Sequence, residues 1–123
     1  MTDEEILEAL EGGKTYILEH GWVRKIFKAK DGRVCALGGV LSAQGYVLPV
    51  DQKYLFGFDG LEAVVKRYNL TVGDRMLATL GNAAGQYASV TAYNDSHSTA
   101  EADVLAMFDN AILATKQRIA DEG

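Results

Sequence analysis

Cys35 is the residue of this sequence that could act as a nucleophile. The 123 residues contain one cysteine and two histidines. A thiol at a helix N-terminus has a lowered pKa and can attack an electrophile when a base is nearby. His97 could be that base, with Asp95 or Asn94 orienting its ring. The competing interpretation is a buried cysteine that serves as a small hydrophobe and a histidine in a surface loop. We favour this second interpretation and expect no catalytic residue.

A second candidate site is the basic segment, residues 23–33. Five of the 12 basic residues lie there beside a single acidic one, Asp31. A local positive patch can attract an acidic partner within a Debye length of about 8–10 Å, whatever the net charge. The segment is either a solvated loop, a site for an acidic partner, or a site for a small anionic ligand such as a nucleotide. The predicted binding residues are Arg24, Lys25, Lys28, Lys30 and Arg33.

Aromatic residues form the third candidate. They lie in residues 44–60, an irregular stretch that also holds the only proline, Pro49. They either fold over the core or form an exposed recognition surface, because Tyr and Phe are enriched at protein interfaces. Tyr46, Tyr54 and Phe56 are added to the predicted binding residues for this reason.

Composition excludes several other classes. His20, His97 and Cys35 have no metal-ligand spacing, and the phosphate-binding glycine motifs are absent, so we expect no metal and no cofactor. A net charge of −5 argues against nonspecific nucleic-acid binding. The acidic N-terminus does not resemble a signal peptide, and no apolar run is long enough to cross a membrane. We expect one cytoplasmic domain over residues 1–123.

The first element that must position these residues is an N-terminal helix. Thr2 and Glu5 have the spacing of a capping box, and acidic residues follow in the first turn. An apolar stripe continues to His20, where Gly21 is a typical C-terminal glycine. The pair at 12–13 is Gly-Gly, which predicts a kink or a break.

The central element is the small, apolar stretch 34–43, with the sequence VCALGGVLSA. A strand is conceivable, but adjacent glycines are unfavourable inside strands. We favour a buried helix whose small face packs against another helix, since a close approach would offset the cost of glycine in a helix, about 1 kcal/mol per residue.

The remaining pattern predicts further helices. Periodic apolar residues indicate a helix ending near Tyr68 and a short one through Leu80. Ser98 and Glu101 form a second capping box before the longest helix, about 99–120. The expected fold class is mainly α, a small domain of four to five helices. Whether residues 23–30 and 86–93 pair as a short two-stranded β element is left open by the sequence.

Four segments together resemble a known family. They are Gly21-Trp22, the stretch 31–41 (DGRVCALGGVL), Tyr93-Asn94-Asp95, and the stretch 98–105 (STAEADVL). They are similar to the GW, CAxGAL and WND-TxxDVL patterns of small uncharacterised domains from actinobacteria and their phages. Two departures are a glycine at position 39 in place of alanine and a tyrosine at 93 in place of tryptophan.

This resemblance implies a mostly helical domain in a bacterial or phage setting, and it implies no activity. Combined with the candidates above, it favours a macromolecular interaction protein, such as a phage protein that binds a host factor. The expected partner is an unidentified protein, and the oligomeric state is open. The alternatives are a small thiol-dependent enzyme that uses Cys35 and a binder of small anionic ligands.

Overall fold

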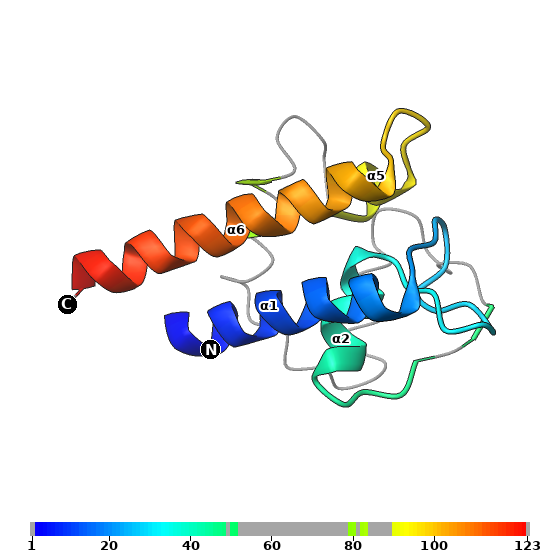
Figure 1. Ribbon diagram of the computed structural model, residues 1–123, viewed down its shortest axis with the longest axis horizontal. Helices are drawn as coiled ribbons and strands as arrows, with labels where there is room; N and C mark the ends of the chain where they lie inside the picture. The colour runs from blue at the N-terminus through cyan, green and yellow to red at the C-terminus, as the bar shows by residue number, and fades with distance from the viewer. Residues whose placement is uncertain (1, 49, 52–78, 81, 84–89, 123) are drawn as a thin grey trace.

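The computed structural model describes residues 2–48, 50–51, 79–80, 82–83 and 90–122 (Figure 1). Its labelled helices are α1 (Asp3–His20), α2 (Ala36–Ala43), α5 (Val90–Asp95) and α6 (Glu101–Glu122). Helices α1 and α6 lie side by side and antiparallel, and α2 packs against α1 (Figure 1). The described part of the chain contains isolated β-bridges and no sheet, so the expected mainly helical fold class is confirmed.

Helix α1 begins as its sequence predicts. The Thr2 hydroxyl accepts from the backbone N–H of Glu5 at 3.1 Å, and the Glu5 carboxylate accepts from the backbone N–H of Thr2 at 3.1 Å. These reciprocal bonds satisfy two of the donors left open at a helix start. At the other end, the Gly21 N–H donates to the carbonyl of Ile17 at 2.8 Å. Gly21 has a φ of 95°, a conformation that favours glycine.

The predicted break at the glycine pair of α1 is absent. The helix runs unbroken for 18 residues because α2 packs directly on these glycines. A Cβ on Gly13 would lie 2.6 Å from Cγ2 of Val40. A Cβ on Gly39 of α2 would lie 3.0 Å from the carbonyl oxygen of Gly13. The small face of the central helix therefore packs against another helix, as expected, and tertiary packing offsets the poor helix propensity of glycine.

Ion pairs hold α6 against α1 at two levels. The Lys14 ammonium pairs with Asp109. Nearer the ends, Nε of Arg118 lies 3.3 Å from Oδ1 of Asp3, a carboxylate that is 97% shielded from solvent. Between them, the two helices bury apolar side chains against α2. The largest fully buried ones in this described core are Phe108, Ile6, Leu10, Ile17, Leu37, Leu41, Leu80, Met107, Val34, Val40 and Val104.

The segment between α1 and α2 has bends at Arg24, Lys25 and Phe27 and a turn at Lys30-Asp31. Val23 N–H donates to the carbonyl of Val34, and Val34 N–H donates to the carbonyl of Gly21, each at 3.0 Å. Hydrogen bonds close the turn around Lys30-Asp31-Gly32: Ala29 N–H donates to the Arg33 carbonyl at 2.8 Å, and Gly32 N–H donates to the Ala29 carbonyl at 3.0 Å. Residues 90–93 are helical in α5, so strand pairing by that part of 86–93 was a wrong alternative.

Two helix starts differ from the expected positions. Helix α2 begins at Ala36 rather than Val34, because Val34 is held in the segment between α1 and α2. Helix α6 begins at Glu101, and the Asp103 carboxylate accepts from the N–H of Ala100 at 2.7 Å. The Ser98–Glu101 capping box was therefore placed too early in the chain. Of the helices expected near Tyr68 and Leu80, only 79–80 belong to the described residues, and these two are helical.

Candidate functional site

Asn94 joins the three parts of the chain that carry the motifs. Its side-chain oxygen accepts from the indole N–H of Trp22 at 2.7 Å and from the backbone N–H of Ala36 at 3.0 Å. Its side-chain nitrogen donates to the carbonyl of Val23 at 3.2 Å. Asn94 is buried, with 1% of its surface exposed. Asn94 therefore has a structural role, because its side chain bonds groups that are distant in the sequence.

Two neighbours extend this cluster. The Asp95 carboxylate accepts from the backbone N–H of Lys25 at 2.8 Å. The Arg24 guanidinium lies 4.7 Å from the centre of the Trp22 ring and donates to the carbonyl of Thr99. A cation over an indole is a favourable contact. Together these contacts fasten the segment after α1 to the loop that precedes α6.

Cys35 is the N-cap of α2 and is buried, with 1% of its surface exposed. Its sulfur accepts from the backbone N–H of Gly38 at 3.3 Å. Sulfur thus fills the place that a serine or threonine hydroxyl takes in many helix caps. A nucleophile must reach its substrate, so attack by this thiol would require the start of α2 to open.

His97, the proposed base, lies exposed in the loop between α5 and α6, while Asp95, its proposed orienting residue, bonds the N–H of Lys25. The thiol-enzyme hypothesis therefore stays a prediction. At the end of α1, His20 stacks on Tyr16 with ring centres 3.9 Å apart.

Most cations of the basic segment have partners within the fold. Arg24 belongs to the Asn94 cluster, and the Lys28 ammonium lies 3.0 Å from the Tyr16 hydroxyl. Arg33 pairs with Asp31 at 2.8 Å. The Arg33 backbone N–H, more than its side chain, lowers the pKa of the exposed Asp31 carboxyl. Lys25 and Lys30 are the exposed lysines of the segment, so a site for an acidic partner would depend chiefly on these two.

Among the three predicted aromatic binding residues, Tyr46 is described, and it packs half-buried against the core. This position fits the interpretation in which the aromatic covers the core. Tyr54 and Phe56 lie outside the described residues, so their part of the recognition surface stays a prediction.

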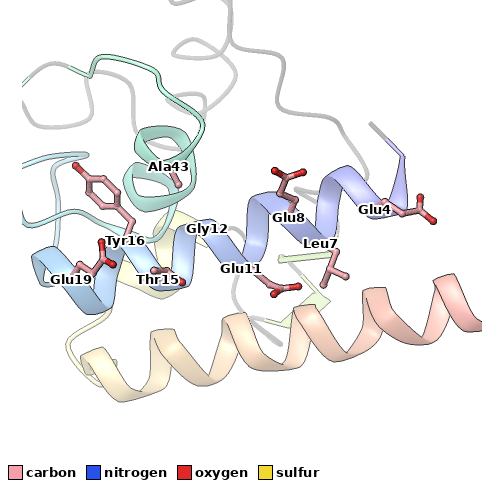
Figure 2. Close-up of a pocket in the computed structure, with 9 residues that line it drawn as sticks. All are labelled: Glu4, Leu7, Glu8, Glu11, Gly12, Thr15, Tyr16, Glu19 and Ala43. Atoms are coloured by element: carbon pink, nitrogen blue, oxygen red, sulfur yellow. The ribbon is translucent and has the colours of Figure 1, made fainter.

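The structure adds a surface that the sequence analysis missed, a hollow of about 580 Å³ along the outer face of α1. We call it the α1 groove (Figure 2). Leu7, Gly12 and Tyr16 supply its apolar and small lining, and Ala43 at the end of α2 closes one side. The carboxylates along it belong to Glu4, Glu8, Glu11 and Glu19. In Figure 2, Glu8 points toward the α2 side, whereas Leu7 and Glu11 point toward α6.

The α1 groove has one sign of charge. Its four glutamates are exposed, and its lining residues include no lysine or arginine. A second hollow of about 480 Å³ shares Glu8, Gly12 and Ala43 with the groove and adds Glu5. A signal for this surface exists in the sequence. Glutamates at 4, 8, 11 and 19 fall on one face of a helix, and the glycine beside them leaves that face hollow.

Other kinds of site have no counterpart in the described part of the chain. Nowhere in these residues do three or more His, Cys, Asp or Glu side chains gather as a metal would require. None of the described helices is both long and apolar enough to cross a bilayer.

The fold and surface define a small helical domain that has an open, acidic groove on one helix and a buried polar cluster around Asn94. A family model described as a family of unknown function (DUF6197) matches residues 1–114. The chain therefore belongs to this family, and the expectation of an uncharacterised small-domain family is confirmed. No curated protein and no solved structure matches the chain.

Proposed function

We propose that this protein acts by binding another protein and that the α1 groove is its binding surface. The observation that carries the proposal is the groove itself, an exposed hollow with an apolar lining and carboxylates along its length. Exposed apolar surface rimmed by polar groups is typical of interaction sites. Of the residues that could have supported chemistry or anion binding, Cys35 and Arg24 have structural contacts within the fold.

The cellular setting belongs to the same proposal. The GW, CAxGAL-like, ND and DVL segments are similar to domains of actinobacteria and their phages, so we place the protein in a bacterial cytoplasm. It would act there as an accessory protein or, if phage-encoded, as a protein that binds a host factor. The basic segment would be a second contact surface, through Lys25 and Lys30, for an acidic part of the same partner.

Site-specific photo-crosslinking in an actinobacterial lysate tests this function. A photoreactive residue at Thr15, which lines the α1 groove, should capture a protein. The matched control carries the same residue at Ala114, an exposed position of α6 outside the groove. Excess unlabelled protein should remove the crosslink at position 15, because specific sites saturate.

Two results would contradict the proposal. Capture of the same proteins from positions 15 and 114 would mean that the groove has no special affinity. A crosslink at position 15 that persists in excess unlabelled protein would mean that the contact is nonspecific.

A further inference from the structure

The chemistry of the α1 groove is specific enough to indicate what kind of partner it fits. From Glu4 to Glu19 the groove follows about 22 Å of helix, given a rise of about 1.5 Å per residue. This length corresponds to about four turns of a second helix laid along α1. The small residues Gly12 and Ala43 lie near its middle, where another backbone could approach closely.

Glu8, Glu11 and Glu19 of the groove carry an electrostatic cost within α1, whereas Glu4 in the first turn is favoured by the helix dipole. Glu4 and Glu8 are four positions apart and Glu8 and Glu11 are three apart, spacings at which like charges destabilise a helix. Glu19 lies in the last turn, where a negative charge opposes the helix dipole. Within the described residues none of these carboxylates has an ion pair. A cationic partner would relieve this cost, and an anionic one would add to it.

We propose that the α1 groove binds a basic amphipathic α-helix of another protein. This inference rests on the proposed protein-binding function and assigns the partner's chemistry. The partner helix places small and aliphatic side chains on Gly12, Leu7 and Ala43, and its flanking lysines and arginines meet the glutamates. Such binding is a helix-in-groove mode with charges that set orientation. A nucleic acid or an acidic peptide does not fit, because the groove repels both.

The test uses the full chain and a synthetic peptide of about 18 residues, which matches the length of the groove at 1.5 Å per residue. The peptide has a leucine and alanine stripe flanked by lysines. We expect saturable binding by isothermal titration calorimetry. A peptide of the same helical pattern with glutamates in place of lysines should not bind. Affinity should fall from 0.1 M to 1 M salt, because the Debye length shrinks from about 10 Å to about 3 Å.

Matched variants separate charge from shape. E8Q/E11Q should weaken binding of the basic peptide about fivefold, since it removes two exposed charge pairs. N110K/Q117K changes the net charge by the same amount on the exposed face of α6 and should leave the affinity unchanged. Thr15→Trp should abolish binding by filling the groove, whereas Ala114→Trp should not. Far-UV circular dichroism of each variant should show unchanged helix content, which indicates that the fold is kept.

The outcomes distinguish this inference from the proposed function. Equal weakening by E8Q/E11Q and N110K/Q117K, or equal binding of the acidic peptide, would overturn the basic-helix inference. If the basic peptide fails to bind while the crosslink at position 15 stands, the partner class is wrong and the binding function remains. If the peptide binds and Thr15→Trp has no effect, the peptide does not occupy the groove and the inference is wrong.

Discussion

The side-chain oxygen of Asn94 lies 2.7 Å from the indole nitrogen of Trp22, which joins residues 72 positions apart in the chain. The same oxygen accepts from Ala36 N–H at the start of α2, so one buried amide fixes three segments. These segments contain the GW, CAxGAL-like and ND patterns. The motif residues therefore have a structural role, since their hydrogen bonds join three segments of the fold. The proposed binding surface lies elsewhere, on α1.

Asn94→Leu should destabilise the protein strongly. The change leaves the Trp22 and Ala36 donors without their acceptor, and each buried, unsatisfied group costs about 1–3 kcal/mol. We expect a loss of about 2–5 kcal/mol in the free energy of unfolding, measured by urea denaturation. Asn110→Leu, on the exposed face of α6, should change it by less than about 0.5 kcal/mol. Similar losses for the two variants would mean that the amide cluster is not a determinant of stability.

Gly38→Ala should be severely destabilising, although alanine favours helices. The added Cβ would overlap the carbonyl oxygen of Phe27, a backbone atom that cannot rotate away. We expect a loss of about 3 kcal/mol or more, beyond the usual cost of overpacking. Gly12→Ala places its Cβ 3.2 Å from Cβ of Ala43, so strain and gained helix propensity should nearly cancel. Thermal melts of both variants should show the larger loss for Gly38→Ala. A Gly38→Ala protein as stable as wild type would refute the close approach of Gly38 to the Phe27 carbonyl.

The Cys35 thiol should react slowly in the native protein and rapidly in denaturant. Its sulfur is buried and caps α2, so a reagent reaches it only when the helix start opens. Native and unfolded reaction rates with a coloured disulfide reagent provide the measurement. Cys35→Ser, which keeps a cap acceptor, should remain folded. Fast native reaction that also depends on His97 would instead support the thiol-enzyme alternative.

The capping box of α1 should make stability depend on pH. The Thr2 backbone N–H, and then its side chain, lower the pKa of Glu5 below its ordinary value. A lowered carboxyl pKa adds stability that is fully present above the ordinary value and disappears as pH falls through the folded value. The stability gap between wild type and Glu5→Gln should therefore shrink on acidification over that window. A gap independent of pH would show that the carboxylate does not cap the helix.

The contribution of the Thr2 hydroxyl to the same capping box can be measured at neutral pH. Thr2→Ala leaves the N–H of Glu5 without its acceptor and should cost about 1 kcal/mol. Thr15→Ala, in the middle of α1 and exposed, should be neutral or stabilising because alanine has the higher helix propensity. The midpoints of urea unfolding measure the stability change of both variants, provided that the dependence of the unfolding free energy on urea concentration is unchanged. Equal effects would mean that propensity rather than capping determines the change.

Substitutions at Arg24 and Lys30 should lower the protein's stability by different amounts, even though both residues belong to the basic segment. Arg24→Met loses the cation over Trp22 and the bond to the Thr99 carbonyl, for a cost of about 1–2 kcal/mol. Lys30→Met, at an exposed position, should cost less than about 0.5 kcal/mol. Charge reversal for binding studies therefore belongs at Lys25 and Lys30. Equal costs would indicate that Arg24 is only a surface charge.

Local features could be predicted from the sequence because their energies act within one or two turns. The bonds between Thr2 and Glu5 join residues three apart, and the Gly21 cap bonds Ile17. The mainly helical class follows from apolar spacing of the same short range. The acidic stripe of α1 is also present in the sequence, as glutamates on one helical face, but it was not predicted as a site because only the structure shows the hollow beside them.

Only tertiary structure decided which distant groups meet. Gly13 does not break α1 because Val40 of another helix packs on it, and no local rule contains that contact. Arg24 looked like part of a free positive patch, yet it bonds a carbonyl 75 positions away. The sequence by itself determined the helices and their caps, whose free energies arise from neighbouring residues. Packing determined which cations have partners, that the Cys35 thiol is buried and which helix face remains exposed, since these depend on how distant parts of the chain pack around the core.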